Sequence, residues 1–388
     1  MFPNQESPES DFLQQMFSTY YKKHVIDSVP DVPYREFGFG VYKRKIANRN
    51  MAFTNVNEVN SFLRDRKPLF FSYSNAYYKF PARTPMSNKE LFKADIIYEF
   101  DADELGLEVP VINEIQWFKP VHLEEAKRQV FRLLDFLHND FGFSDDGVAI
   151  NFSGKAGFHV HLRSKSIQDL NKRARIELVD YLTAQNMDFT NLGFDFDSFV
   201  APKQKGLWQA RLIIGLKEFF EKDTKEISKL TDFPTKKVSP LVKSKDALFS
   251  SLDKGVLMQV EGRKGGEFWK KVLEIVAKSE RVPIDRQTSI DLHKIIRVPA
   301  TLHGDTGMVA KIIPIDSLKD FDAFNDSVVF DEKFAKEFDL NTIKVTVKEA
   351  PAFELLNKKF GPYKDEVVEL PLFAAAYLVG KGAAVLKQ

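Results

Sequence analysis

Two aspartates lie one residue apart at the end of an apolar run, in the segment IIYEFDAD at 96–103. In a β-strand, the period of two places Glu99, Asp101 and Asp103 on one face. Such close negative charges repel each other, and a divalent cation offsets that cost because magnesium and manganese prefer carboxylate and phosphate oxygens. Surface strands also carry acidic residues, so this pattern alone leaves a metal site and a solvated face as alternatives.

A second set of polar residues lies in the segment SGKAGFHVH at 153–161. Its glycines let backbone N–H groups approach an anion, and Lys155 adds a charge suited to phosphate. The segment is not a Walker A loop, which needs G-x-x-x-x-G-K-[ST], and an ordinary hairpin turn is the alternative. His159 and His161 share a face of the following strand. We expect one of them to contact phosphate and the other to be a supporting polar group.

The third set lies in IDRQTSIDLHKIIRVPATLHGDTG at 284–307. It contains the carboxylates Asp285 and Asp291, then Arg297 and His303, and it ends in a turn signal. Four of the seven histidines of the chain lie in the second and third sets. This concentration of ionisable groups favours a functional site over chance.

Hydrophobic spacing predicts the elements that must position these residues. Strands are expected at 96–100 and in a hairpin of 148–152 with 158–163. Residues 122–140 form the clearest predicted helix, with apolar residues at the three-four spacing and Lys127 on the outer face. The acidic pair and the glycine loop therefore lie at strand ends.

The order of the elements predicts one core interrupted by a helical segment. Residues 166–280 are helical in pattern and rich in lysine, whereas β character returns from 282 to 314. We therefore expect a discontinuous catalytic core, 1–165 and 281–388, with a mainly helical insertion at 166–280.

Composition limits the classes of protein and partner. The chain has 388 residues, 44% hydrophobic and 29% charged, with a net charge of +1, so polyanion binding requires a local basic groove. It contains no cysteine, which excludes an iron–sulfur cluster or cysteine-ligated zinc within this chain. It has no apolar run of about 18 residues. The polar N-terminus is unlike a signal peptide. We expect a cytoplasmic location, associated with the nucleoid in a prokaryotic cell, and no membrane partner.

In their order and types, the three sets resemble the motifs of the small catalytic subunit of archaeal and eukaryotic replicative primases. That family carries an acidic strand motif hhhDhD, a loop SGxxGxHxH and a later stretch similar to hD…hhRxPxShHGxTG. Arg35-Glu36-Phe37 and NRNMAF at 48–53 resemble its N-terminal elements, and VVELPLFAAAYLV at 367–379 resembles its C-terminal element. The resemblance covers nearly the whole chain and is weakest across the helical middle.

The resemblance implies an α/β (α+β) fold, with an RRM-like mixed sheet flanked by helices and a helical insertion. It implies a metal-binding catalytic triad for two Mg²⁺ or Mn²⁺ ions at Asp101, Asp103 and Asp285, with Asp291 as the competitor for the third place. It also implies a triphosphate site made by Ser153, Lys155, His159, Arg297 and His303. Glu36 and Arg49 are expected to support the site.

Three departures from the family pattern concern zinc and phosphate binding. A cysteine-free chain cannot have the cysteine zinc element of many relatives, and the segment 105–119 is short. Lys155 and Ala156 stand where some relatives have two arginines. Asp305 replaces a lysine often found before the final Thr-Gly, which puts a cationic role there in doubt.

The function implied by the resemblance is template-directed primer synthesis on single-stranded DNA from nucleoside triphosphates, by two-metal nucleotidyl transfer. Such a DNA-directed RNA polymerase of the primosome would pair with a large primase subunit that carries an iron–sulfur cluster. The alternatives are a stand-alone primase-polymerase or end-joining polymerase of the same superfamily, and a non-catalytic single-strand binding module. The acidic triad argues against the last, because metal-free carboxylates repel a phosphate backbone.

Overall fold

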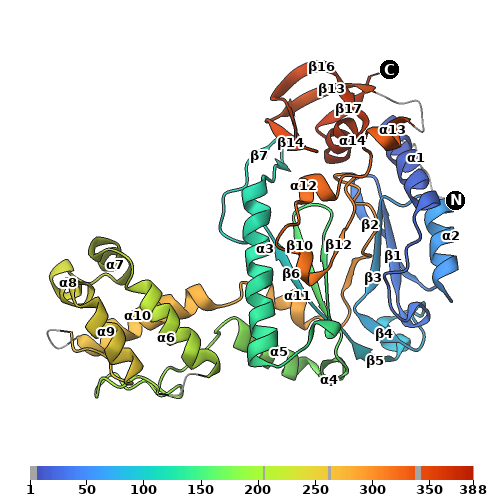
Figure 1. Cartoon of the computed structure of the whole chain (residues 1–388). Coiled ribbons are helices and arrows are strands. Elements are labelled where there is room, and N and C mark those ends of the chain that lie inside the picture. The colour runs from blue at the N-terminus through green and yellow to red at the C-terminus, as the bar shows by residue number, and fades with distance from the viewer. Residues whose placement is uncertain (1–6, 204–205, 261–263, 337–341, 388) are drawn as a thin grey trace. The chain divides into compact units, whose positions relative to one another are not determined.

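The computed structural model describes residues 7–203, 206–260, 264–336 and 342–387, and these divide into two compact units (Figure 1). The first unit consists of 1–132, 143–176 and 284–388. The second consists of 133–142 and 177–283. The two units are described one after the other.

One four-stranded sheet of the first unit brings the third motif set beside the N-terminal strands. Its order is β11 (Ile295–Arg297), β3 (Phe70–Ser74), β1 (Phe37–Val41) and β2 (Arg44–Met51). Arg297 pairs with Ser72 across β11 and β3. Residues more than two hundred positions apart in the sequence thus become neighbours in this sheet.

The other four-stranded sheet carries the first and second motif sets. Its order is β12 (Ile312–Ile313), β9 (Val148–Phe152), β10 (Gly157–Leu162) and β6 (Ile96–Asp101). Tyr98 and Phe100 are fully buried, in agreement with the predicted alternation along β6. Gly157 lies opposite Asp101, and a Cβ at Gly157 would be only 1.9 Å from the Phe100 carbonyl oxygen. A side chain at 157 is therefore incompatible with this close approach of β10 to β6.

Smaller sheets complete the first unit. A C-terminal sheet has the order β16 (Tyr363–Pro371), β13 (Thr342–Ala350) and β17 (Ala384–Leu386). Three pairs of short strands stand apart from it: β4 (Ala76–Tyr78) with β5 (Leu91–Ala94), β7 (Val111–Ile112) with β8 (Ile115–Gln116), and β14 (Phe353–Leu355) with β15 (Lys358–Phe360). The last helix, α14 (Leu372–Lys381), packs against all three strands of the C-terminal sheet.

Helices cover the sheets of the first unit. In addition to α14, they are α1 (Pro8–Lys23), α2 (Val56–Arg66), α3 (Pro120–Asp135), α4 (Lys165–Gln168), α11 (Arg286–Ile290), α12 (Ala323–Asp326) and α13 (Glu332–Lys336). Figure 1 shows α3 alongside the sheet that contains β6 and β10. The predicted helix 122–140 corresponds to α3 and the π-helical turn Phe136–Asp140 that follows it.

The prediction that Lys127 lies on the outer face of α3 is wrong. Lys127 is buried, and its ammonium donates hydrogen bonds to the carbonyls of Lys319 and Phe321 at 3.1 and 2.9 Å. Its long aliphatic stem lets the ammonium reach these acceptors from the packed side of the helix.

The second unit is helical. It contains the end of α5 (Lys172–Leu182), then α6 (Leu207–Phe219), α7 (Thr224–Thr231), α8 (Thr235–Lys243), α9 (Lys245–Asp253) and α10 (Gly265–Glu280). α10 packs against α6 and α7 around the buried Leu212, Trp269 and Val272. This helical content agrees with the helical pattern predicted for 166–280.

The predicted α+β class is confirmed, and every strand pair in the described ranges is antiparallel. The β character expected throughout 282–314 is interrupted by α11, which begins after the capping residue Asp285. In the part of the chain that the structure describes, every helix is too short or too polar to cross a membrane.

Candidate active site

The polar residues of the three motif sets meet at one cavity of about 410 Å³ in the first unit. Strands of both four-stranded sheets contribute to its walls. All the predicted site residues except Asp285 line it: Asp101, Asp103, Ser153, Lys155, His159, Arg297 and His303. The two sheets thus place the strand-end carboxylates and the basic residues around the same space.

Negative charge is concentrated at one side of this cavity, where β6 ends. Burial, followed by the neighbouring charges of Glu99, Asp103 and Glu104, raises the pKa of Asp101 to about 6, against the opposing effect of Lys294. The Lys294 ammonium forms an ion pair with Glu99. The acidic side therefore carries more negative charge than this lysine neutralises.

The donor set fits a hard divalent cation, although the described residues contain no group of three or more His, Cys, Asp or Glu side chains arranged as a metal site. Mg²⁺ usually takes one or two protein carboxylates, and substrate phosphates and water supply the rest. Asp101 and Asp103 meet that requirement. After burial, the charges of Glu99, Asp103 and Glu104 contribute to the raised pKa of Asp101, and a cation would relieve their repulsion.

Asp285 lies at the N-terminus of α11, and its carboxylate caps that helix. It accepts hydrogen bonds from the Gln287 backbone N–H at 2.9 Å and from the Thr288 hydroxyl at 2.5 Å. Burial acts to raise its pKa, but these hydrogen bonds outweigh burial and lower the pKa below its ordinary value. α11 packs against β6, and the charge of Asp285 helps to raise the pKa of Glu104. Asp285 thus lies close enough to act on the acidic side.

Asp291, the competitor for the third carboxylate, lies at the other end of α11. Its side chain accepts the His293 backbone N–H at 2.8 Å, and its backbone carbonyl accepts the Asn75 amide at 2.7 Å. It lines a different cavity, together with Lys172 and Gln287. The assignment of Asp285 as the third ligand stays a prediction.

The glycine loop is organised by its own serine. Ser153 Oγ accepts the backbone N–H groups of Lys155, Ala156 and Gly157 at 3.3, 3.2 and 3.1 Å. Gly154 has a φ of +86°, and a Cβ there would be 2.8 Å from the His303 Cβ. A side chain at 154 would therefore push the loop away from the third motif set.

Arg297 and His303 form the buried part of the basic side. The Arg297 guanidinium donates to the Leu302 carbonyl at 3.3 Å, and burial lowers its pKa to about 10. His303 Nδ1 accepts the Asp305 backbone N–H at 3.1 Å. Burial, followed by the charges of Arg297 and Lys155, lowers the pKa of His303 well below its usual value. The ring is therefore neutral near pH 7, and Nε2 carries its proton as a hydrogen-bond donor.

The two histidines of β10 have different surroundings. His159 lines the cavity and lies 3.9 Å from a Glu99 oxygen, and burial lowers its pKa to about 4. His161 lies in a buried network in which its ring nitrogens contact Asn151 Oδ1 at 2.9 Å and the Tyr73 hydroxyl at 3.3 Å. His159 is thus placed to meet a ligand, whereas His161 holds the strands together.

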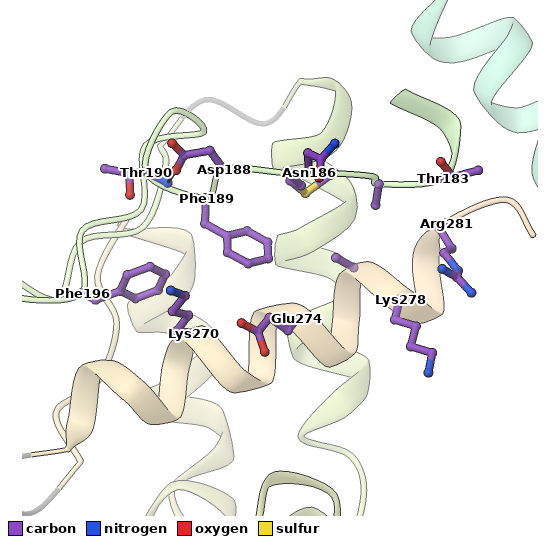
Figure 2. A pocket seen from close by; sticks show the side chains of 13 residues that line it. Thr183, Asn186, Asp188, Phe189, Thr190, Phe196, Lys270, Glu274, Lys278 and Arg281 are labelled. Carbon is purple, nitrogen blue, oxygen red and sulfur yellow. Dashed lines mark hydrogen bonds between the residues drawn. The ribbon is translucent and has the colours of Figure 1, made fainter. Parts of the chain in front are cut away.

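A larger cavity, of about 590 Å³, lies within the helical unit (Figure 2). Figure 2 shows Phe189 pointing toward α10, along which Lys270, Glu274 and Lys278 are arranged, with Arg281 directly after its end. Its lining includes none of the motif residues and no histidine. The size of a cavity alone would favour this space as the functional site. The chemistry of the lining residues favours the smaller one.

Comparisons with known proteins agree with the residues found at the smaller cavity. The family model for the DNA primase small subunit matches residues 100–315. The chain is 30% identical to the DNA primase small subunit of Methanothrix thermoacetophila, over 98% of this chain and 99% of that protein. It is 29% and 28% identical to those of Methanosarcina barkeri and Halorubrum lacusprofundi, over 96% of this chain and 95% and 97% of theirs. The chain belongs to the DNA primase small subunit family.

Other residues of the chain line the cavity or lie beside it without belonging to the predicted set. Lys294 lies within the third motif set, between Asp291 and Arg297. This position could have identified it as a site residue from the sequence. Lys45 and Gln116 also line the cavity, but no motif singled them out. Lys381 lies near Lys155 and Asp305, because the charges of both residues contribute to the pKa shift of Lys381. It follows the apolar C-terminal element that the resemblance identified.

The N-terminal elements of the chain form an ionic network around a buried carboxylate. Glu36 is buried and pairs with Arg49 at 2.9 Å and with Lys89 at 3.1 Å. Arg49 also donates to the His293 carbonyl at 3.3 Å, directly before Lys294. This arrangement connects strand β2 to the segment that enters the cavity.

Proposed function

We propose that this chain is the catalytic subunit of a replicative DNA primase and synthesises short primers on single-stranded DNA by nucleotidyl transfer. Members of its family are nucleotidyltransferases that synthesise RNA primers on DNA. The observation that carries the proposal is one cavity with carboxylates at one side and basic residues at the other. Nucleotidyl transfer needs both, because a triphosphate must be bound and its reacting charges stabilised.

The acidic side is the proposed metal site. Asp101 and Asp103 would hold Mg²⁺ or Mn²⁺, with Asp285 as the third carboxylate of a two-ion site. When bound, the ions supply electrophiles that neutralise charge on the attacking oxygen and on the triphosphate. The protein keeps the carboxylates close together at the end of β6, so that the unfavourable charge repulsion favours cation binding.

The basic side is the proposed triphosphate site. Lys155 and Arg297 would neutralise the phosphates, and the Nε2–H groups of neutral His159 and His303 would donate hydrogen bonds to their oxygens. Ser153 holds the loop in the shape that presents Lys155. Positioning and electrostatics are thus the main contributions of these residues.

The proposed partners are a single-stranded DNA template, nucleoside triphosphates and a large primase subunit with an iron–sulfur cluster. The cysteine-free chain cannot supply the ligands of that cluster, so they must come from the partner. Primer synthesis on DNA would place the complex in the cytoplasm, at the nucleoid of a prokaryotic cell.

Replacing Asp101 with alanine tests the proposal directly. We expect Asp101→Ala to abolish nucleotide incorporation on a single-stranded template while the thermal unfolding temperature stays at or above that of the wild type. Removing a half-buried carboxylate that its neighbours repel does not cost stability in the metal-free protein. The exposed Asp320→Asn is the matched control and should retain full activity.

The assay should contain Mg²⁺ or Mn²⁺, ribonucleotides or deoxyribonucleotides, and the large subunit in one arm only. Wild-type incorporation by Asp101→Ala would overturn the assignment of the active site. Efficient extension of DNA ends by the chain alone, without primer synthesis when the large subunit is present, would instead indicate a stand-alone polymerase.

A further inference from the structure

Two hydrogen bonds connect the last turn of α14 to the carboxylate of Asp103. The Lys381 ammonium donates to the Gln116 backbone carbonyl at 2.8 Å. The Gln116 side-chain amide donates to Asp103 Oδ2 at 2.7 Å. Neither Lys381 nor Gln116 belongs to the three motif sets, and 265 positions separate them in the sequence.

Asp103 needs a partner to be held in place. It lies beyond the end of β6, in a turn closed by the hydrogen bond from the Glu104 N–H to the Asp101 carbonyl at 3.0 Å. Its residue is exposed, so neither the sheet nor core packing restricts its side chain. The Gln116 amide engages one oxygen and leaves the other carboxylate oxygen available to a ligand.

The hairpin that carries Gln116 depends on contacts outside itself. β7 and β8 pair only with each other in the described ranges, with Val111 opposite Gln116 and Ile112 opposite Ile115. Two strands of this length are not stable alone in water. The position of Gln116 must therefore be set by the elements that the hairpin packs against.

Lys381 supplies such a contact from α14. Its ammonium lies 5.0 Å from the centre of the Trp117 ring and 5.1 Å from that of Tyr377. Trp117 directly follows β8 and also packs edge-on against Tyr377, with ring centres 6.3 Å apart. Cation–π contacts and a carbonyl acceptor together offset the cost of burying the ammonium. The end of α14 thus holds the end of the hairpin.

We propose that Gln116 is the positioning residue for Asp103 and that Lys381 positions Gln116, so that the C-terminal helix sets how the acidic pair meets a divalent cation. This inference rests on the proposed function of the cavity. Partners of a metal-binding carboxylate restrict its orientation, and their loss weakens metal binding. Lys381 acts through the hairpin and needs no contact with the ion or the substrate.

Mn²⁺ binding measured by electron paramagnetic resonance, without nucleotide or template, tests this arrangement in the full chain. We expect Gln116→Leu to weaken Mn²⁺ binding by about tenfold, the lower range for the loss of such a partner. Lys381→Met should also weaken Mn²⁺ binding, by a smaller factor. Lys381→Arg, which keeps the positive charge, should bind Mn²⁺ as the wild type does. Because both changes act on the same carboxylate, Lys381→Met should add little in the Gln116→Leu background.

Two controls separate this effect from general changes in the hairpin or in charge. Val111→Thr alters the exposed residue opposite Gln116, and Lys364→Met removes an exposed lysine from β16. Both should bind Mn²⁺ as the wild type does. Asp101→Asn reports on the metal site itself, so its failure to weaken binding would contradict the proposed function instead.

Wild-type Mn²⁺ affinity in a folded Gln116→Leu protein would overturn the inference. So would fully additive losses in the double variant, since they would show that Lys381 acts independently of Gln116. If Lys381→Met does not fold, Gln116→Leu and Lys381→Arg decide the question. In that case Lys381→Arg must bind as the wild type does.

Discussion

Asp305 is the residue at which this chain departs most clearly from a purely basic phosphate site. Its carboxylate forms an ion pair with Lys155, with 2.8 Å between Oδ2 and Nζ. Both side chains are partly buried, each 24% exposed. The sequence already made a cationic role at position 305 doubtful. The structure shows that the Asp305 carboxylate is the ion-pair partner of Lys155, the lysine of the glycine loop. In the proposed triphosphate site, Asp305 would compete with phosphate for Lys155.

Asp305→Asn should therefore tighten nucleotide binding. Removing the competing charge leaves Lys155 available, and we expect the Kd of a non-hydrolysable nucleoside triphosphate to fall about threefold, equivalent to about 0.6 kcal/mol. Isothermal titration calorimetry at low and high salt measures the change. Salt should reduce the difference, because the interaction is electrostatic.

The control for this change is Asp320→Asn, which removes an exposed carboxylate outside the cavity lining. An unchanged or weaker Kd in Asp305→Asn would show that Lys155 does not bind the phosphates. This result would not contradict the proposed role of Asp101 in metal binding.

Strand β10 shows how one element serves both the core and the cavity. All its residues are buried, and its pairing with β6 places His159 opposite Glu99. A histidine that is buried and neutral in the folded chain lowers the free energy of unfolding at acid pH, because only the unfolded chain then binds the proton. Burial lowers the pKa of His159 from 6.5 to about 4, and it also lowers that of His161 well below its usual value.

The sign of the resulting pH dependence follows from these shifts. Between about pH 6.5 and pH 4, His159 binds a proton in the unfolded chain but not in the folded chain. The contribution of neutral His159 to the free energy of unfolding is therefore complete above this range and is lost as the pH falls. For this one residue the loss at pH 5 is about 2 kcal/mol. The substitution His159→Asn removes this pH-dependent term. The decrease in the free energy of unfolding that it causes should therefore be about 2 kcal/mol smaller at pH 5 than at pH 7.

Urea unfolding at the two pH values measures this difference. His24→Asn serves as the control for replacing an exposed histidine. An identical free-energy difference between His159→Asn and the wild type at pH 5 and pH 7 would contradict the assignment of a neutral, buried His159.

At the scale of the whole molecule, the chain divides into a sheet-containing unit that holds the cavity and a helical unit that holds none of the motif residues. The segment 177–283 of the helical unit overlaps the predicted insertion at 166–280, whereas its segment 133–142 falls in the predicted core. We propose that the helical unit is a separate domain inserted into the catalytic core.

A core substitution in the helical unit should then affect that unit alone. Leu212 on α6 is fully buried, and Leu212→Ala should destabilise its unit by about 2–5 kcal/mol. Differential scanning calorimetry should show one of two transitions shifted to lower temperature, with Mn²⁺ binding unchanged below it. The fully buried Leu63→Ala in α2 should shift the other transition. A single transition that moves as a whole in both variants would show one cooperative unit.

Local pattern was sufficient to predict several elements. The apolar spacing around Val130 and Leu137 predicted α3, and the turn at Gly154 predicted the hairpin of β9 and β10. The same reasoning failed for Lys127 and for α11, because a long side chain can turn back into the core and a five-residue helix has little periodicity. Short elements take their conformation from capping and packing, as Asp285 shows.

The sequence by itself determined the residue types of the cavity and the face of β6 on which Glu99 and Asp101 lie, whereas Asp103 lies in the turn after the strand. Periodicity and the composition of each motif involve residues that are close together in the sequence, so both can be recognised without a structure. Only the tertiary structure decided that Asp305 pairs with Lys155, that Lys294 pairs with Glu99, and that Gln116 and Lys381 lead to Asp103. The physical reason is that charge interactions and burial depend on distance in space, and these partners come from distant parts of the chain.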